Sequence, residues 1–577
     1  MGSLSPRYEL YHYISTRADY DPVKTFYVCA PEADACSYSA AEAFAERSGW
    51  KALAEEEGAV LVLPLAKNGW AGQPLTLLRD IYMDTKASFP SQNGRSLHGR
   101  GGFLWCWETL LYLIGYEEGA VFAGNALGAC PNVFAAAALV NGVPDDLTHA
   151  EEPSSHWLVK EVSGSYAARN RDIPVALWML TEEPAALPAA RYFAALNGAP
   201  EAPLEASFDG IAAKVWANDA DPARQVRLSA GLFEAGPALT QAVYRHFLRR
   251  VIRWKNGPDG KLAVLTPAEE LVSSGRYLRR QAQAGGNTYG YYVHLPKGKT
   301  AAQCAGLPLV FSVHGRGEPA WMFTQKNGWE ELADETGEFV LICPDSPGNI
   351  WFLSRDGEAF PEMVRRMKEE FAIDAERVYL TGFSNGAMIT REAGTKYPQL
   401  FAGLSPWNGP AMPTANLNGA EETALCDGVY AQFPGSGWQM PYFVYLGDSD
   451  PAAARGSDGS TLGRMLAAGG CRAQPTGQDV PPFVPDEMYT GENHYTPHRG
   501  YAEGGRMTAY VYCAEEGIPI TAMTVMRDMP HGAVHDESRA AWEFLRRWRR
   551  PQNSKHVERV AAGRDAGHEN LGKGGTL

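Results

Sequence analysis

The chain has 577 residues, more than a single hydrophobic core usually holds, so we expect two domains of roughly 250 residues each. Hydrophobic residues make up 45% and charged residues 21%, an ordinary composition for a globular protein. The formal net charge of −15 argues against nucleic acid or an anionic membrane surface as a partner. It says little about a neutral substrate, and association into a homo-oligomer stays open.

Two absences bear on location and cofactors. The N-terminal residues Met1–Arg7 lack an apolar segment of signal-peptide length, and no apolar run of roughly 18 residues suggests a membrane span. We therefore expect a cytoplasmic protein, or a secreted one whose signal peptide has been removed. The nine cysteines form no Cys-x-x-Cys pair or Cys/His cluster with metal-site spacing, so we expect neither a metal nor another cofactor.

Residues 48–64 are typical of a helix, a glycine, a buried strand and a proline, in that order. The same order recurs at residues 327–344, where Trp329 takes the place of Trp50. This recurrence predicts two copies of one α/β unit in the chain. The alternative is that two α/β units look alike only because they share a fold.

The first copy has no complete set of catalytic groups. Gly124 and Gly128 have the spacing of a turn that presents a nucleophile, but Ala126 stands between them. A strand at 175–180 is followed by carboxylates, whereas residues 228–237 contain no histidine. Without a hydroxyl or an imidazole there is no triad, so we expect the first copy to support the second, by shaping its cleft or mediating assembly.

A turn-rich break at residues 255–260, Lys-Asn-Gly-Pro-Asp-Gly, separates the copies. We expect a degenerate domain at 1–255, a catalytic domain at 256–550, and a polar, mobile tail at 551–577.

In the second copy, an apolar run at 307–313 ends in His314-Gly315-Arg316-Gly317. A glycine-rich loop after a strand can direct backbone N–H groups at a developing negative charge, so we expect an oxyanion-hole donor here, with Gly315 and Arg316 as the leading candidates. We interpret His314 as structural.

Residues 377–383 form a β-rich run that enters the Gly-x-Ser-x-Gly pattern around Ser384, with helix-compatible residues from 385 to 396. Gly382 and Gly386 suit a turn where strand and helix approach closely. The pattern predicts a nucleophile elbow, in which the N–H of Asn385 is the second oxyanion-hole donor.

A carboxylate follows the next clear strand, at 442–446, and we prefer Asp450 to Asp448 as the triad acid. Asp450 before Pro451 also suits a helix N-cap, which is the competing interpretation. Residues 452–510 are far longer than a usual connection and are expected to form an insertion, either a cover over the substrate or a loop without a role.

An imidazole follows the strand at 520–526, and we prefer His531 to His535 as the base because Gly532 follows it in a loop. A helix-like segment at 537–549 closes the fold. The order Ser384, Asp450, His531 is that of an α/β-hydrolase triad, in which the histidine activates the serine and the acid orients the histidine. The sequence therefore predicts a serine hydrolase.

Residues 280–550 resemble the polyhydroxyalkanoate-depolymerase-like esterases, which include feruloyl and acetylxylan esterases. The resemblance rests on residues 313–315, 374–388, 397–403 and 541–545. Together with the repeat, it predicts tandem α/β-hydrolase domains, and it implies that the second is catalytic through Ser384, Asp450 and His531. The inactive first copy and the long insertion before His531 depart from the common single-domain form of the family. It further implies a carboxylic ester hydrolase acting on small-molecule or polymeric feruloyl, acetyl or hydroxyalkanoate esters.

Substrate-binding residues are harder to assign. Trp351, Trp407 and Trp438 are expected near the mouth of the site, where aromatic faces stack on a phenolic group or a sugar, but the same residues also suit a core. Two alternatives to the esterase stay open: a peptidase on the same fold, and a non-catalytic binding or scaffold protein.

Overall fold

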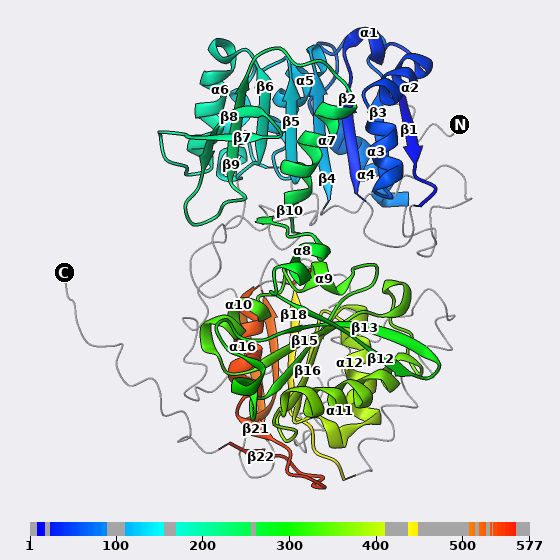
Figure 1. Cartoon of the computed structure of the whole chain (residues 1–577), viewed down its shortest axis with the longest axis vertical. Coiled ribbons are helices and arrows are strands. Elements are labelled where there is room, and N and C mark those ends of the chain that lie inside the picture. The colour runs from blue at the N-terminus through cyan, green and yellow to red at the C-terminus, as the bar shows by residue number, and fades with distance from the viewer. Residues whose placement is uncertain are drawn as a thin grey trace, which may run out of the picture.

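The computed structural model describes residues 8–17, 24–88, 110–154, 169–254, 261–409, 437–447, 507–513, 519–526, 531–533 and 535–560. Two bodies follow each other along the chain, and each is built on a large sheet (Figure 1). No helix among the described residues is long and apolar enough to cross a membrane.

The described strands of the N-terminal half form a nine-stranded sheet in the order β1-β3-β2-β4-β5-β6-β9-β8-β7. The strands are β1 (Leu10–Ile14), β2 (Thr25–Cys29), β3 (Val60–Pro64), β4 (Leu111–Tyr116), β5 (Ala136–Val140), β6 (Leu177–Thr181), β7 (Leu204–Phe208), β8 (Ile211–Ala217) and β9 (Gln225–Ala230). The run from β3 to β9 is parallel, and β1, β8 and β7 add antiparallel edges.

The described strands of the C-terminal half form a second nine-stranded sheet, in the order β12-β13-β15-β14-β16-β17-β18-β20-β19. The strands are β12 (Leu278–Ala284), β13 (Asn287–His294), β14 (Leu309–Val313), β15 (Val340–Pro344), β16 (Val378–Phe383), β17 (Gly403–Trp407), β18 (Tyr442–Gly447), β19 (Met507–Cys513) and β20 (Pro519–Met526). The run from β15 to β20 is parallel, and β13, β12 and β19 are antiparallel.

The two sheets share one order of parallel strands. Numbered along the chain, the parallel strands among the described residues run 2-1-3-4-5-6 in each half, from β3 to β9 and from β15 to β20. An antiparallel strand flanks this run on both sides in each half. The fold is therefore α/β-hydrolase-like and is built on large mixed sheets.

Helices connect the parallel strands, as parallel pairing requires. In the N-terminal half they are α1 (Glu32–Ala35), α2 (Tyr38–Arg47), α3 (Trp50–Glu56), α4 (Leu77–Ser88), α5 (Glu118–Ala129), α6 (Glu183–Leu196) and α7 (Pro237–His246). In the C-terminal half they are α8 (Ala268–Ser273), α9 (Ala320–Phe323), α10 (Trp329–Thr336), α11 (Ala359–Phe371), α12 (Asn385–Lys396) and α16 (His535–Leu545).

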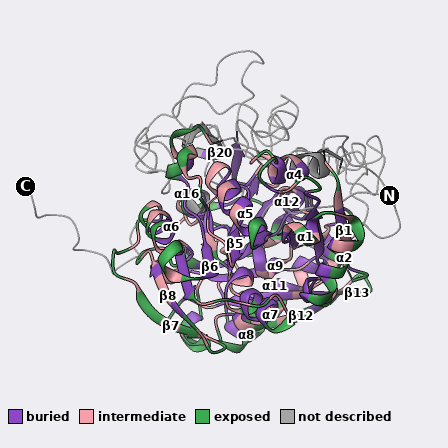
Figure 2. Ribbon diagram, turned by 90° about the horizontal axis from the view of Figure 1, so that it is seen from above, coloured by how far each residue is buried: buried purple, intermediate pink, exposed green. Residues whose placement is uncertain are grey.

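β14 illustrates why the central strands are apolar throughout. All five of its residues are buried, and Leu309, Phe311 and Val313 pack in one hydrophobic cluster while Val310 packs in another. Successive side chains of a strand point to opposite faces of the sheet, so both faces are covered. Figure 2 shows the same contrast between buried central strands and exposed outer elements such as β7.

The predicted repeat at 48–64 and 327–344 is present as similar structure. Gly49 and Gly328 precede α3 and α10 with φ of 87° and 74°, values that favour glycine. Each helix begins at a fully buried tryptophan and is followed by a buried strand that ends in proline.

Three predicted segments differ from expectation or lie wholly or partly outside the described residues. The tail expected from 551 is not free at its start, because β22 (Glu558–Arg559) pairs with β21 (Trp548–Arg549) and Val557 is buried. The insertion expected at 452–510 lies outside the described residues up to 506, and its last four residues belong to β19. The predicted break at 255–260 also lies outside them.

Candidate active site

Ser384 lies at the sharp turn between β16 and α12, at the carboxyl end of a central parallel strand. Its backbone has φ of 55° and ψ of −115°, a strained conformation for a residue with a side chain. A Cβ on Gly382 would lie 2.3 Å from the carbonyl oxygen of Gly386, and one on Gly386 would lie 2.4 Å from that of Val313. Only glycine fits at these two positions, so the turn has the geometry of a nucleophile elbow.

His531 is next to this serine. Its Nε2 lies 2.9 Å from Oγ of Ser384, within hydrogen-bond distance for proton transfer. The half-buried imidazole packs against the ring of Phe383, with ring centroids 4.8 Å apart. The rival histidine, His535, is the first residue of α16.

Asn408 holds the loop that carries His531. Its Nδ2 donates to the carbonyl oxygen of Gly532 at 2.9 Å, and its Oδ1 accepts from the N–H of Gly447 at 2.7 Å. The side chain is buried and the residue has φ of 45°. Asn408 therefore ties the histidine loop to the carboxyl end of β18. Sequence reasoning missed it, although an Asn-Gly pair directly after a strand is a recognisable turn signal.

The predicted acid, Asp450, and its rival Asp448 lie outside the described residues. The strand before them, β18, ends at Gly447, which pairs with Met526 of β20. The two chain segments that lead to the predicted acid and base thus leave the sheet side by side.

The loop after β14 brings backbone N–H groups next to the elbow, and one of them is already bonded. Gly317 donates its N–H to the carbonyl oxygen of Asn349 at 2.7 Å, which removes it from consideration. A Cβ on Gly315 would lie 3.5 Å from Cβ of Ser384, so the backbone of Gly315 lies against the elbow. Arg316 follows it and is half-buried. Asn385 begins α12, where a backbone N–H has no intrahelical acceptor.

His314 supports this loop as a neutral side chain. Its Nδ1 lies 2.6 Å from the carbonyl oxygen of Gly315, and its Nε2 accepts from the N–H of Ser346 at 3.1 Å. These partners assign the proton to Nδ1. Complete burial lowers the pKa of His314, which agrees with the structural interpretation made from the sequence.

Two of the three tryptophans proposed as substrate contacts are instead core residues. Trp351 and Trp407 are 0% and 1% exposed, so neither has a ring face open to an incoming group. Trp351 donates its Nε1–H to the carbonyl oxygen of His314, and its backbone exchanges two hydrogen bonds with the side-chain amide of Asn385. Its contribution is to hold the elbow and the loop at His314 together.

Trp438 lies near the amino ends of the parallel strands, whereas Ser384 lies at their carboxyl ends, so Trp438 is not placed to bind substrate. It precedes β18, whose first residue is Tyr442, whereas Ser384 follows the last residue of the parallel strand β16. A strand of this length spans about 20 Å, so the two residues lie at opposite ends of the sheet. Trp438 packs on the core and lies 5.3 Å from the guanidinium of Arg550.

Glu392, on the same helix as the elbow, was not predicted and has no sequence signal. It is 4% exposed, and burial raises the pKa of its carboxyl to about 7. One oxygen accepts the N–H of Ser354 at 2.5 Å, and the other has no hydrogen-bond partner among the described residues. Glu392 thus anchors the loop that contains Trp351.

The N-terminal half contains the same sharp turn, and it is not where the sequence placed it. The residue between β4 and α5 is Glu117, with φ of 52° and ψ of −122°, whereas Ala126 lies inside α5. A Cβ on Gly119 would lie 2.3 Å from the carbonyl oxygen of Cys29, just as one on Gly386 would lie 2.4 Å from the carbonyl oxygen of Val313. The assignment of the first elbow to Ala126 is therefore wrong. The spacing of Gly124 and Gly128 led to this error, because the same spacing occurs inside a helix as well as at a turn.

The asparagine tie is also repeated. Asn141, with φ of 55°, donates its Nδ2–H to the carbonyl oxygen of Phe233 at 2.7 Å and accepts the N–H of Phe233 at 3.0 Å. The bond from Nδ2 of Asn141 to Phe233 corresponds to the bond from Nδ2 of Asn408 to Gly532, so Leu232 takes the position of His531. Leu232 is 77% exposed. The N-terminal turn thus has a carboxylate at the nucleophile position and no imidazole at the position of the base.

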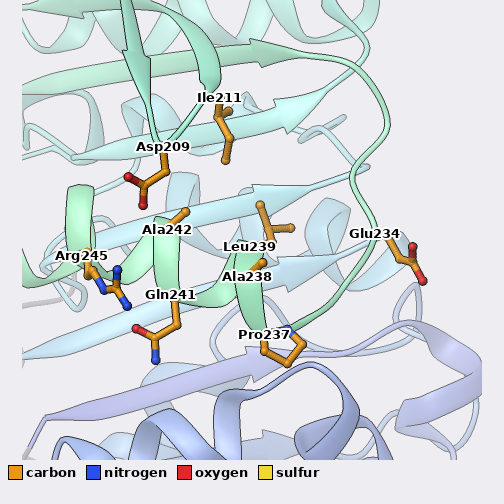
Figure 3. Close-up of a pocket in the computed structure, with 9 residues that line it drawn as sticks. All are labelled: Asp209, Ile211, Glu234, Pro237, Ala238, Leu239, Gln241, Ala242 and Arg245. Carbon is orange, nitrogen blue, oxygen red and sulfur yellow. The ribbon is translucent and has the colours of Figure 1, made fainter.

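One open cavity of about 650 Å³ belongs to the N-terminal half alone. Its lining comes from the turn after β7, from the start of β8, from α7 and from the loop before α7, with Asp209, Glu234 and Arg245 among the polar groups (Figure 3). Ser384 and His531 are not among these residues.

Three groups in the C-terminal half lie close enough to hold a metal ion, namely His294, Glu330 and Asp334. They already have protein partners: Glu330 is paired with Arg276, and Nε2 of His294 lies 2.7 Å from Oδ1 of Asp334. We interpret them as an ion-pair network of the fold.

No protein-family model matches the chain. It is 28% identical over 251 residues to poly(3-hydroxyalkanoate) depolymerase C of Paucimonas lemoignei, covering 39% of this chain and 59% of that protein. It is 34% identical over 189 residues to a bifunctional acetylxylan esterase/xylanase of Neocallimastix patriciarum, covering 32% of this chain and 26% of that protein. The chain thus spans less than two thirds of these relatives. Among solved structures, it is similar to an acetyl xylan esterase from Aspergillus awamori, with 15% identity, 46% of this chain and 99% of that chain covered, and a TM-score of 0.34.

The two sequence similarities agree with the resemblance carried by the motifs around Ser384. The chain is accordingly similar in sequence to a poly(3-hydroxyalkanoate) depolymerase and to acetylxylan esterases, and its strand order gives it an α/β-hydrolase-like fold.

Proposed function

We propose that this protein is a serine carboxylic ester hydrolase that acts through an acyl-enzyme on Ser384. The observation that carries the proposal is the 2.9 Å contact between Nε2 of His531 and Oγ of Ser384, at a turn with the backbone geometry of a nucleophile elbow. Its relationship to esterases supports the same chemistry.

In the proposed mechanism, Oγ of Ser384 attacks the ester carbonyl carbon while Nε2 of His531 accepts the hydroxyl proton. The oxyanion receives hydrogen bonds from the N–H of Asn385 and from an N–H of Gly315 or Arg316. The intermediate collapses as His531 returns the proton to the leaving alcohol. Water then attacks the acyl-enzyme with the same histidine as base, which releases the acid and frees Ser384.

Asp450 is our candidate for the group that orients His531, with Asp448 as its rival. Both follow β18, which pairs in parallel with the strand that precedes His531. A carboxylate there would fix the imidazole tautomer and stabilise the imidazolium.

The substrate class is proposed from the relatives. Acetyl, feruloyl and hydroxyalkanoate esters are the candidates, because the relatives are named acetylxylan esterases and a poly(3-hydroxyalkanoate) depolymerase, and feruloyl esterases are the third group in the resemblance. Trp351, Trp407 and Trp438 are not part of the proposed substrate site, because the first two are buried and the third lies at the far end of the strands.

We further propose that the chain consists of two α/β-hydrolase-type domains, of which the first lacks a nucleophile. The shared strand order, the strained turns at Glu117 and Ser384, and the ties by Asn141 and Asn408 support a duplicated unit. Leu265 still packs in the N-terminal core, so we place the boundary after it.

The test is hydrolysis of p-nitrophenyl acetate and butyrate, methyl ferulate and a hydroxybutyrate oligomer by wild type and Ser384→Ala, with labelling by an organophosphonate. We expect turnover and labelling in wild type and neither in the variant. An amide panel separates the peptidase alternative. Absence of turnover on every ester, together with an unlabelled Ser384, would reject the proposal in favour of a binding protein.

A further inference from the structure

The segment that follows the oxyanion loop, residues 318–327, lies between the two halves of the chain; we call it the interdomain wedge. It includes the short helix α9, which Figure 1 shows at the junction beside α8 and β10. Met322 is fully buried in the hydrophobic cluster of the N-terminal half, whereas Ala320 and Phe323 pack in a cluster of the C-terminal half. The wedge therefore contributes side chains to both cores.

Polar contacts hold the wedge to the segment that joins the halves. Gln325 exchanges two hydrogen bonds with the backbone of Thr266: its Oε1 accepts the N–H at 2.9 Å, and its Nε2 donates to the carbonyl oxygen at 3.0 Å. This reciprocal pairing fixes the wedge next to Leu265, which belongs to the N-terminal core.

A buried ion pair occupies the same wedge. Nζ of Lys326 lies 3.3 Å from Oε1 of Glu318, and the two residues are 7% and 1% exposed. Burying two charges costs free energy that their attraction seldom exceeds, so stability alone does not account for such a pair. The ammonium also lies 4.8 Å from the centroid of the Phe383 ring and 5.6 Å from that of Trp254. Lys326 thus connects an aromatic ring of the N-terminal half to one next to Ser384.

The ring of Phe383 contacts both the candidate base and the oxyanion loop. Its ring lies 4.8 Å from that of His531, measured between centroids. Gly315 is packed so closely on the same ring that a Cβ there would lie 2.9 Å from Cδ1 of Phe383. Phe323 of the wedge stacks on it at 6.1 Å. A shift of this ring would displace the base and the oxyanion loop relative to Ser384.

We propose that the N-terminal half positions the catalytic groups of the C-terminal half through the wedge, with Lys326 as the positioning residue. This inference rests on the ester hydrolase function proposed above and gives the first half a role in it. The ring of Trp254 packs against Lys326. Lys326 and Phe323 in turn pack against the ring of Phe383. Through its contacts with His531 and Gly315, Phe383 keeps these two residues in position beside Ser384.

The test compares Lys326→Met with the double variant Glu318→Gln/Lys326→Met, which removes both charges. Because misplacement by about 1 Å can cost two orders of magnitude in rate, we expect kcat on p-nitrophenyl acetate to fall about 10-fold to 100-fold in both, with KM changed less than about 3-fold. The rate of organophosphonate labelling of Ser384 should fall in parallel, since the adduct needs the oxyanion hole. Lys326→Arg should recover part of the loss.

The control is Arg276→Met/Glu330→Gln, which removes an ion pair between a half-buried arginine and a buried glutamate. Among the described residues, its side-chain hydrogen bonds go to each other, to Thr266 and to Tyr277. We expect kcat of this control to stay within about 2-fold of wild type, because it does not support Phe383.

If Lys326→Met does not fold, Trp254→Phe, which keeps an apolar ring but recedes from Lys326, should still lower kcat about 3-fold or more without raising KM. Unchanged kcat in the folded Lys326 variants, or in Trp254→Phe, would overturn the inference. An equal loss in the Arg276/Glu330 control would do the same, since it would show a general loss of stability. A wild type without turnover and without labelling would instead reject the ester hydrolase proposal itself.

Discussion

Ser384 and Glu117 occupy the same backbone conformation in the two halves of the chain, with φ/ψ of 55°/−115° and 52°/−122°. Each follows the third parallel strand of its sheet and precedes a helix of 12 residues. The strained turn is present twice, yet only one of the two carries a hydroxyl with an imidazole beside it. This difference leads to the first prediction.

Glu117→Ser in a Ser384→Ala background should restore no ester turnover. The new serine would have the elbow geometry, but Leu232 stands where the base would be, so nothing would take the hydroxyl proton. The measurement is p-nitrophenyl acetate hydrolysis, with Ser384→Ala alone as the baseline. Turnover clearly above that baseline would contradict our interpretation of the N-terminal turn.

Asn408→Ala should lower kcat by about 10-fold to 100-fold, because the histidine loop would lose its tie to the end of β18. Asn141→Ala is the matched control, since it removes the equivalent tie in the N-terminal half. Asn408→Ala should lose about 1 to 3 kcal/mol of unfolding free energy in urea, the cost of unsatisfied buried partners. Asn141→Ala should lose less, because Asn141 and Phe233 are half-buried. Equal kcat in the two variants would mean that the tie has no role at the site.

Asp450→Asn should lower kcat by roughly 10⁴-fold, the loss that the same change causes in a serine protease triad, because the amide favours the wrong imidazole tautomer. Asp448→Asn should have a much smaller effect. Steady-state kinetics of the two variants on one ester decide between the candidates. The reverse ranking would assign the acid to Asp448.

Glu392→Gln should stabilise the protein at alkaline pH and not at acid pH. Burial raises the pKa of Glu392 from its ordinary value of 4.5 to about 7 in the folded state, so the folded state binds this proton more tightly than the unfolded state. The stability of the wild type relative to the variant should therefore fall as pH rises from 4.5 to 7. By linkage, the difference reaches about 3 kcal/mol above that range.

Urea unfolding at about pH 4.5 and pH 8 measures this difference, and a pH-independent difference would argue against a buried charge. Glu362→Gln is the control of opposite sign. Hydrogen bonds from Arg365 and Arg366 lower the pKa of Glu362 to about 2, so this change should destabilise at neutral pH, with the effect fading as pH falls toward 2.

The elbow at Ser384 was accessible from the sequence because its requirements are local. The two glycines, Gly382 and Gly386, lie within five residues of each other, at a point where the strand and the helix leave no room for a Cβ. The strand β16 before them and the helix α12 after them are each indicated by the local pattern of apolar residues. The preference for His531 over His535 also agrees with the contact to Ser384. The two residues are 147 positions apart in the chain, and the strand order brings them together.

The tryptophans show where local reasoning ends. Trp351 and Trp407 were open to two interpretations, and their burial depends on which helices cover the sheet. The prediction that Trp438 lies near the mouth of the site was wrong, because the sequence does not show which end of β18 lies near Ser384. The parallel pairing of β18 with β17 and β20 determines that orientation. The error at Ala126 has the same origin, since a glycine spacing does not say whether it lies in a turn or inside a helix.

The amino-acid sequence was enough to predict the alternation of strands and helices and the candidate nucleophile, because turn chemistry and hydrophobic periodicity act over a few residues. Only the tertiary structure decided the equivalence of Glu117 with Ser384, the ties made by Asn408 and Asn141, and the place of Lys326 between Trp254 and Phe383. These relationships join residues far apart in the chain, and they exist only once packing of the two sheets and their helices has brought those residues into contact.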